Sequence, residues 1–460
     1  MANVQAKAEP QVAVTRPIAE EAAARRFEDL PLDVIEIVRQ CLMDWIAVAV
    51  GGSDDPSARL LLEAAVDEGG PGRATLIAAG RRGTVAQAAL VNGNASHVLD
   101  YDDVNMHMSV HPSAVIFPAL LALAEERGSS GRDVINAFVT GYEGGCRIGL
   151  LMSPGHYRHG FHGTATIGTF AAAIACARLL DLDASKTAHA IGIAATEAAG
   201  IRAMFGTMCK ALHAGKTAQN GLFAAVMAAR GFQSREDALE CEHGFAATHG
   251  PDFHPDRALA KVPGDGYRLH DNLFKFHAAC YAVHAPIEAL IELKTANGIT
   301  PDMVEGVTMR VAPHLSSVCD IREPKTGLEA KFSLRFSAAL VLGGQDTGRP
   351  EAFADELTGE PGLVALRDKI DVAFDPAFSQ YATQVDIRLR NGTTVTTRQA
   401  VGKPMTDLSA QRARLRAKFD KLVIPSFGGA AAGEIVAHVE DLARASSIAP
   451  LMKLCAGPAK

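Results

Sequence analysis

The sequence predicts a mainly helical protein of two domains, in which a smaller α+β domain is inserted into an all-helical one. Three observations support this: the length of the chain, helical periodicity at both of its ends, and one stretch with strand alternation and a hairpin signal. The chain has 460 residues, which exceeds the size at which a single hydrophobic core usually stops growing. Apolar residues make up 48% and aromatic residues 6% of it, a composition typical of closely packed helices joined by short turns.

Helical periodicity fills most of the first half of the chain. Apolar residues recur at three- and four-residue spacing from Ile35 to Ala49, and Gly51-Gly52 then ends this helix. Similar patterns predict helices at 114–125, 133–142, 168–180, 186–198 and 217–229. Several of these segments are apolar on most faces, which is typical of helices buried on many sides.

The pattern changes after Gly264. Residues 384–390 alternate cleanly between apolar and charged side chains, Asn391-Gly392 follows, and residues 393–398 are rich in Thr and Val. An Asn-Gly pair between such runs is a strong hairpin signal, because both central residues must accept positive φ. After Pro404 the helical pattern returns. We therefore expect an α+β domain with an antiparallel sheet at 267–405, an all-helical domain at 18–266 and 406–460, and a disordered tail at 1–17.

Composition and charge argue against several classes of function. The net charge of −7 gives no electrostatic reason to expect nucleic acid as a partner. No segment reaches the roughly 18 to 20 uninterrupted apolar residues of a membrane helix, and the N-terminus lacks the apolar core of a signal peptide. The eight cysteines are scattered without a CxxC pair, which indicates reduced thiols rather than a disulfide framework. We expect a cytoplasmic protein that binds neither nucleic acid nor a membrane.

The segment from His97 to His111 concentrates proton-active side chains. Three interpretations stay open: acids that cap a helix end beside half-buried histidines, a divalent metal site, and acid–base catalysis without metal. The third has a physical basis, because clustered carboxylates and imidazoles push each other's pKa values toward the working pH. The segment lacks the Gly and Glu positions of a calcium loop, and the chain has no HExxH. Its carboxylates and imidazoles are Asp100, Asp102, Asp103, His97, His107 and His111.

Two further segments place cations and backbone donors in apolar surroundings. His162 stands just before Gly163 and Thr164, where the N–H groups of a helix start favour an anion. Lys210 and His213 share one helix face, and a substrate carboxylate is a natural partner for such a pair. The plainer alternatives are a helix N-cap and a lysine that reaches from a helix end to solvent. No GxSxG, GxGxxG or zinc-ligand spacing is present.

Taken in order, these segments resemble the MmgE/PrpD family, which includes 2-methylcitrate dehydratase, cis-aconitate decarboxylase and iminodisuccinate epimerase. The similarity runs from about Leu30 to about Phe427. The segments that carry it are His97-x-x-Asp100-x-Asp102-Asp103 with His111-Pro112-Ser113, Gly141-Tyr142-Glu143 with Arg147-Ile148-Gly149, His162 with Thr166–Phe170, Gly206-Thr207-x-x-Lys210-x-x-His213, Lys275–His284 and Glu329–Ser333.

The resemblance implies a homodimer without metal or organic cofactor, and an active site in the cleft between the two domains. Two segments depart from the family's pattern. Lys275-Phe276-His277-Ala278 stands where the family often has Lys-x-Tyr-Pro, and Phe336 stands where it often has the Tyr that lines the site of the decarboxylases. Phe336 cannot donate a proton, which argues against a decarboxylase identical in detail to that branch. By resemblance the catalytic residues are Asp100, His111, His162, Lys210 and Lys275, and the substrate-binding residues are His97, Tyr142, His213, His277 and Phe336.

The family's reactions make or break a bond next to a carboxylate, through a carbanion- or enolate-like state. We expect the two lysines, with His213, to hold the carboxylates of a small anionic substrate. Asp100 and His111 are expected to be base and acid, in an order that the sequence leaves open, and His162 to assist.

The first expectation for the reaction is dehydration of a hydroxy-polycarboxylate, as in 2-methylcitrate dehydratase. Epimerisation of an amino- or hydroxy-dicarboxylate and decarboxylation of cis-aconitate are the alternatives within the family. A metal-dependent hydrolase and a non-catalytic helical binding protein are the alternatives from other classes. Asp102 and Asp103 are expected to organise their loop and to cap a helix.

Overall fold

The computed structural model describes residues 12–458, which divide into two compact units. Unit 1 holds the chain up to Val98, residues 103–272 and the chain from Ser426 onward, and unit 2 holds residues 99–102 and 273–425. Unit 1 is mostly helical and unit 2 combines helices with a sheet, so the predicted mainly helical fold with an inserted α+β part is confirmed.

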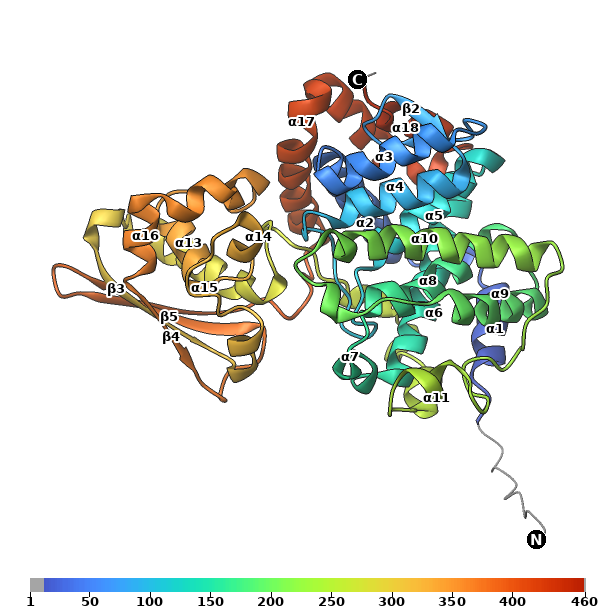
Figure 1. The fold of residues 1–460 in the computed structure, drawn as a ribbon, viewed down its shortest axis with the longest axis horizontal. Helices are drawn as coiled ribbons and strands as arrows, with labels where there is room; N and C mark the ends of the chain where they lie inside the picture. The colour runs from blue at the N-terminus through green and yellow to red at the C-terminus, as the bar shows by residue number, and fades with distance from the viewer. Residues whose placement is uncertain (1–11, 459–460) are drawn as a thin grey trace, which may run out of the picture. The chain divides into compact units, whose positions relative to one another are not determined.

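Unit 1 is a stack of helices drawn from both ends of the chain (Figure 1). Its helices are α1 (Thr15–Ala24), α2 (Leu32–Gly52), α3 (Pro56–Glu68), α4 (Val85–His97), α5 (Pro112–Arg127), α6 (Gly131–Met152), α7 (Gly155–His159), α8 (Gly163–Leu179), α9 (Ala184–Glu197), α10 (Met208–Ala229), α11 (Phe245–His249), α12 (Pro255–Leu259) and α18 (Ala449–Cys455).

The centre of unit 1 is built from small residues, which lets its helices approach closely. In α8 every residue from Gly163 to Ala177 is buried, as expected for a helix that is apolar on most faces. Helix α4 packs on α10 through two glycines, and a Cβ added at Gly93 would lie 2.8 Å from the Cα of Gly215. This close packing brings the C-terminal end of α4 beside α8 and α10, where the candidate site lies.

The predicted helices of the first half are confirmed as α2, α5, α6, α8, α9 and α10. A short antiparallel hairpin, β1 (Ala74–Leu76) with β2 (Arg81–Gly83), also lies in unit 1 and was not predicted. Strands of three residues are too short for alternation to show in a sequence. Residues 1–11 of the predicted tail lie outside the described residues. The tail ends earlier than predicted, because Glu240 accepts hydrogen bonds from the backbone of Val14 and Thr15 at the start of α1.

Unit 2 contains a four-stranded sheet in the order β4-β3-β5-β6, and helices α13, α15 and α16 lie along one side of it (Figure 1). Its strands are β3 (Val304–Val311), β4 (Ile370–Phe374), β5 (Ala382–Leu389) and β6 (Thr394–Ala400). Its helices are α13 (His284–Asn297), α14 (Gly327–Ala330), α15 (Leu334–Leu342) and α16 (Pro361–Arg367).

The hairpin predicted at Asn391-Gly392 is confirmed: β5 and β6 pair antiparallel, with Arg388 opposite Thr394. Strand β3 also pairs antiparallel with β5, and its register shifts between Val304 and Gly306. This irregularity explains why residues 304–311 alternate only partly in the sequence. Strand β4 was missed, and it pairs parallel with β3, so the sheet is mixed rather than wholly antiparallel.

The first part of helix α17 (Leu408–Glu440) belongs to unit 2 and its last part to unit 1. The helix breaks at Gly428, whose φ is 77°. The part up to Pro425 packs in unit 2, so that unit extends past the boundary expected at 405. Among the described helices α17 alone is long and apolar enough by composition to cross a membrane. The break argues against this, because charged side chains such as Lys418 and Lys421 stand before it and residues 429–440 are shorter than the roughly 20 that a span needs.

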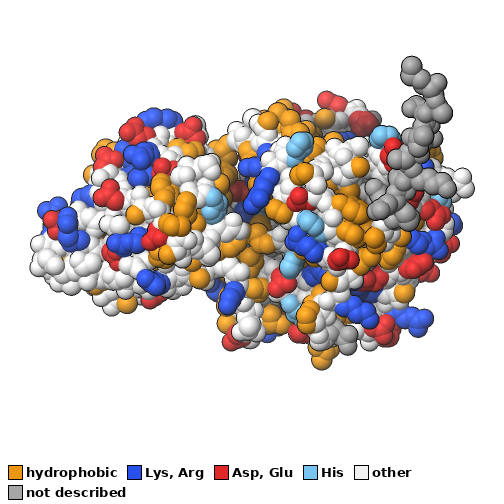
Figure 2. All heavy atoms as spheres, turned by 90° about the horizontal axis from the view of Figure 1, so that it is seen from below, with side chains coloured by type: hydrophobic (Ala, Val, Ile, Leu, Met, Phe, Trp, Pro, Cys, Tyr) orange, Lys and Arg blue, Asp and Glu red, His pale blue; other side chains and the backbone are white. Residues whose placement is uncertain are grey.

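Figure 2 shows how charged side chains are distributed over one face of the protein. On the face drawn in Figure 2, basic and acidic side chains are interspersed with hydrophobic ones instead of gathering by sign. This mixed pattern fits a chain whose net charge is −7, and it offers no basic stripe of the kind that tracks a phosphate backbone.

Candidate active site

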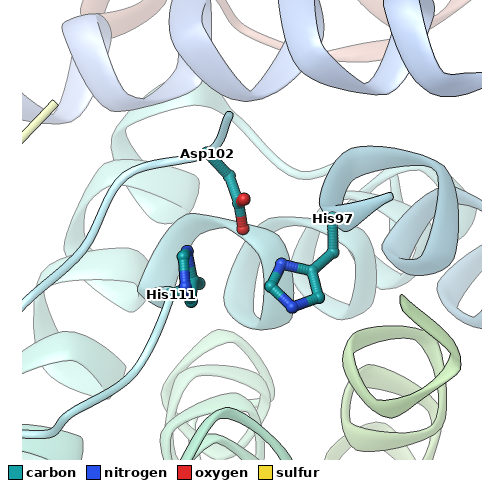
Figure 3. Close-up of side chains that lie close together, drawn as sticks. All are labelled: His97, Asp102 and His111. Carbon is teal, nitrogen blue, oxygen red and sulfur yellow. The ribbon is translucent and has the colours of Figure 1, made fainter. Parts of the chain in front are cut away.

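Two histidines of unit 1 face each other at the ends of the loop between α4 and α5. His97 is the last residue of α4 and His111 is the N-cap residue of α5. Their rings meet edge to face with centroids 4.7 Å apart, and Figure 3 shows both rings with Asp102 of the connecting segment. Asp103 caps α5 as expected, accepting hydrogen bonds from the backbone N and the Oγ of Ser113 at 3.1 and 2.6 Å.

Two glycines fix the loop that carries His111. A Cβ added at Gly149 of α6 would lie 2.5 Å from the Cα of Met108, and one added at Gly163 of α8 would lie 2.5 Å from the carbonyl oxygen of Ser109. Side chains at these positions would push the loop away, since real Cβ atoms do not approach other atoms so closely. The glycines that begin α8 and lie within α6 therefore have a packing role that holds His111 in place.

His162 and His213 extend this pair to a group of four imidazoles within unit 1, here called the histidine group (His97, His111, His162 and His213). His162 is the N-cap residue of α8, and its ring lies 6.0 Å from that of His97. Its Nδ1 is 3.0 Å from the Nδ1 of His213 on α10. One of the two nitrogens therefore carries a hydrogen and donates a hydrogen bond to the other. The predicted site residues of unit 1 thus come together from α4, α5, α8 and α10.

Burial and nearby charges keep His162 and His213 uncharged near neutral pH. Burial lowers the pKa of His162 well below 6.5, and the charges of His97, Lys210, His111 and His213 lower it further. Burial also lowers the pKa of His213, and the Lys210 ammonium adds to this shift. Neutral imidazoles can accept a proton at pH 7, whereas imidazolium ions cannot. Lys210 stands one turn before His213 on α10 and supplies a positive charge beside these potential bases.

Lowered histidine pKa values also predict that the protein loses stability in acid. Burial lowers the pKa of His156 from 6.5 to about 4, while unfolding returns it to its ordinary value. Between pH 6.5 and 4 the unfolded chain therefore binds more protons than the folded protein does. The contribution of His156 to the free energy of unfolding has its full value above pH 6.5 and falls as the pH drops. For His156 alone the loss is about 3 kcal/mol.

Urea denaturation between pH 7.5 and 4.5 measures this dependence. We expect the His156→Gln variant to show a shallower loss of stability across this range than the wild type. The matched control is His314→Gln, at an exposed position, which should keep the wild-type slope. Equal slopes in all three proteins would contradict the assignment of His156 as a buried neutral histidine.

In unit 2 the predicted residues Asp100 and Lys275 form a buried ion pair. The Nζ of Lys275 lies 3.1 Å from the Oδ1 of Asp100 and donates to the carbonyl oxygen of the same residue at 2.7 Å. Both side chains are almost entirely buried, and Asp100 has a positive φ of 53°. A non-glycine residue in this region is strained, and such strain persists only where surrounding contacts enforce it.

Tyr142 lies in the helical core of unit 1, where its hydroxyl donates to the Oδ1 of Asn272 at 2.8 Å. Its neighbours in the motif bind the same stretch of chain: Glu143 accepts from the backbone N of Leu269, and Arg147 donates to the carbonyl oxygen of Ala258. This motif thus anchors residues 258–272. A substrate-binding role for Tyr142 stays a prediction.

The other two predicted substrate-binding residues lie in unit 2. His277 is buried, with Nδ1 2.8 Å from the Oγ1 of Thr347 and Nε2 3.3 Å from the Oε1 of Glu288. Phe336 is fully buried in α15. The structure therefore gives each of them a packing or hydrogen-bonding role within its own unit, and their contact with a substrate stays a prediction.

A divalent metal that takes imidazole and carboxylate ligands would use His97 and His111 with a carboxylate. Asp102, drawn with them in Figure 3, is the residue of suitable chemistry.

Comparisons with known proteins match both parts of the chain to one family. Residues 16–258 match the MmgE/PrpD N-terminal domain, and residues 277–442 match the MmgE/PrpD C-terminal domain. The cis-aconitate decarboxylase of Aspergillus terreus is 27% identical over 490 residues, covering 100% of this chain and 99% of that protein. The human cis-aconitate decarboxylase is 27% identical over 388 residues, covering 80% and 79%. A cis-aconitate decarboxylase-like protein of Aspergillus oryzae is 30% identical over 301 residues, covering 62% of each chain.

These relatives are enzymes of the lyase type by name, and the two domain matches together span both units. The match to the N-terminal domain alone covers more than half of the chain. The resemblance stated from the sequence motifs is therefore confirmed. The chain belongs to the MmgE/PrpD family.

Proposed function

We propose that this protein is a lyase that acts on a small polycarboxylate by proton transfer at a carbon next to a carboxylate. The observation that carries the proposal is the histidine group beside Lys210, in which burial and the nearby ammonium hold imidazoles neutral at pH 7. Neutral bases next to a fixed cation suit an anionic substrate whose reaction moves a proton.

The chemistry of the histidine group follows from the charge that develops during such a reaction. Loss of a proton or of carbon dioxide next to a carboxylate leaves negative charge on an enolate-like group. In a dehydration the proton is lost first, and departure of the hydroxyl group then discharges the enolate-like group. Lys210 would stabilise that charge, because a part-buried ammonium is screened less by water than an exposed one. His111, assisted by His162, would return the proton, since an imidazole ring has both an acceptor and a donor nitrogen.

Asp100 and Lys275 would supply a second carboxylate–ammonium pair for the same reaction. Lys275 neutralises Asp100 in the absence of substrate, at a distance of 3.1 Å. A substrate carboxylate that binds Lys275 would compete for that ammonium and leave Asp100 more basic. The pair can therefore couple substrate binding to activation of a base, and we propose that Asp100 is the base and His111 the acid.

Among the family's reactions, decarboxylation of cis-aconitate is the first to test, because the relatives in Aspergillus terreus and human carry that name. Phe336, which has no hydroxyl and is buried, argues for a variation in substrate or in proton donor from that branch. Dehydration of a hydroxy-polycarboxylate such as 2-methylcitrate, and epimerisation of a dicarboxylate, are the other reactions the same groups would support.

The test is a screen of cis-aconitate, citrate, 2-methylcitrate, tartrate and amino-dicarboxylates, followed by proton NMR and by a carbon dioxide assay. Release of carbon dioxide identifies a decarboxylase, a new or lost alkene without gas identifies a dehydratase, and altered stereochemistry alone identifies an epimerase. A true substrate should also raise the melting temperature, because it binds only the folded protein. Turnover of none of these acids would contradict the proposal.

A metal-dependent hydrolase is the competing proposal, and His97, His111 and a carboxylate are the residues that favour it. Metal analysis of purified protein, with turnover measured before and after a chelator, separates the two. Stoichiometric metal whose removal abolishes turnover would favour the hydrolase. Turnover that survives the chelator supports a lyase that needs no metal.

We also propose that the enzyme is a cytoplasmic homodimer that binds neither nucleic acid nor a membrane. This rests on the resemblance of the sequence and on its mixed surface charge. Light scattering during size-exclusion chromatography gives the mass in solution. A mass near twice 48.4 kDa supports the dimer, and a mass near one chain would contradict it.

A further inference from the structure

Three lysines of unit 2 hold three successive backbone carbonyls of the short segment Leu99–Asp102. Lys331 donates to the carbonyl oxygen of Leu99, Lys275 to that of Asp100 and Lys418 to that of Tyr101, each at 2.7 Å. The lysines come from distant parts of the sequence. Each is buried, with exposed fractions of 8%, 2% and 3%. We call this arrangement the lysine clamp.

A buried lysine is costly to maintain, because its ammonium loses the solvation of water. Lysines seldom occupy such positions unless their charge is compensated by specific contacts. Here the compensating contacts converge on one four-residue segment. Lys418 adds a second hydrogen bond, to the carbonyl oxygen of Lys275 at 3.1 Å, and its Nζ lies 3.9 Å from the centre of the Tyr101 ring.

Tyr101, a residue of the segment itself, adds hydrogen bonds to the backbone of other parts of unit 2. Its hydroxyl donates to the carbonyl oxygens of Phe276 and Gly348, at 2.8 and 3.1 Å. The backbone on both sides of Asp100 is thus bound to unit 2. These contacts hold Asp100 at its left-handed φ of 53°, a conformation that is uncommon for non-glycine residues and that Asp adopts more readily than most.

We propose that Lys331 and Lys418 are positioning residues, which hold the segment 99–102 in the one backbone conformation that aims the Asp100 carboxylate for reaction. The catalytic part of this inference rests on the proposed function, in which Asp100 is the base. Lys275 differs from the other two because it also pairs with the carboxylate itself. Lys331 and Lys418 donate to backbone carbonyls of the segment, and the Lys418 ammonium also lies over the Tyr101 ring, so both act on Asp100 through its neighbours in the chain.

The test replaces each positioning lysine by methionine, which keeps the length of the side chain and removes the ammonium. Hydrogen–deuterium exchange followed by peptide mass analysis reports directly on the amides of residues 99–103. We expect Lys418→Met and Lys331→Met each to speed exchange there by about tenfold or more, because one charged hydrogen bond to the segment is lost.

Two lysines of the same unit provide matched controls. Lys294 donates to the carbonyl oxygen of Val341 and Lys369 to that of Val304, both at 2.8 Å and both away from the segment. Lys294→Met and Lys369→Met lose the same kind of hydrogen bond. They should leave exchange at 99–103 and the kcat at their wild-type values.

Kinetics then test whether the clamp positions Asp100. We expect kcat to fall by about a hundredfold in Lys418→Met, as for other small misplacements of a reacting group, while KM changes little. The solvent deuterium isotope effect on kcat should rise as well, because proton transfer becomes slower than product release. A merely structural lysine would lower the melting temperature without changing this isotope effect.

The outcomes separate the clamp from the proposed function. Unchanged exchange at 99–103 in both lysine variants would overturn the clamp, whatever the enzyme's substrate. Faster exchange with unchanged kcat would overturn the positioning role. If the wild type turned over no polycarboxylate, the proposed function would fail, and the exchange data would still decide whether the clamp exists. Should one variant not fold, the other makes the same test.

Discussion

Asp100→Asn is expected to lower kcat by about a hundredfold or more, with the fold intact. Asparagine has nearly the same shape as aspartate, and Lys275 still donates to the backbone carbonyl of the residue at 2.7 Å. The substitution removes the charge and the basicity of the carboxylate. Steady-state kinetics on the substrate found in the screen measure the effect, and a thermal melt checks the fold.

Lys275→Met should cause a loss of similar size, and the double variant should be little worse than either single one. Residues that act as a unit lose their contribution together, so their effects do not add. The control is Asp386→Asn, whose carboxylate pairs with Arg310 in the sheet of unit 2. That variant should keep wild-type kcat. Additive losses at Asp100 and Lys275 would show that the two residues do not work as a pair.

Lys210→Met carries the second large expected effect, a fall in kcat/KM of about a hundredfold or more. The ammonium is the cation beside the histidine group, and its loss removes the charge that would hold the substrate and stabilise the enolate-like state. The control on the same helix is Lys216→Met, an exposed lysine that bonds Gln219. It should keep wild-type kinetics.

The Lys210→Met variant should also change the pH dependence of the reaction rate. Lys210 lowers the pKa of both His162 and His213, after the larger effect of burial. In the wild type the acid limb of the pH–rate profile should therefore lie below pH 6.5, since the bases stay neutral until then. Removing the ammonium raises these pKa values, so the acid limb should move to higher pH. A limb that moves to lower pH, or does not move, would contradict the electrostatic role of Lys210.

The elements predicted well from the sequence are those whose signal is local. Helix α8 shows continuous apolar character, and the β5–β6 hairpin shows alternation around Asn391-Gly392. Strand β4 was missed because Ile370–Phe374 is short, and its pairing partner β3 lies far away in the sequence. The boundary of unit 2 was placed too early because α17 is one periodic helix in sequence, although it changes unit near Pro425.

In the candidate site, too, residues in local motifs could be predicted from the sequence, and contacts between distant segments could not. The sequence identified His111, His162 and Lys210 by chemistry and by resemblance, but their assembly depends on packing between helices that no local pattern encodes. Lys418 was missed entirely. It stands next to Phe419 in an ordinary helical pattern, and only the fold shows that it is buried against Tyr101.

The measurement that tests the central claim most directly is turnover of cis-aconitate and 2-methylcitrate in D₂O, followed by NMR. A lyase that works by proton transfer next to a carboxylate should place solvent deuterium at that carbon of the product or of recovered substrate. The Asp100→Asn and Lys210→Met variants should slow this incorporation by about a hundredfold or more. Turnover without deuterium at that carbon, or incorporation at the wild-type rate in both variants, would contradict the account.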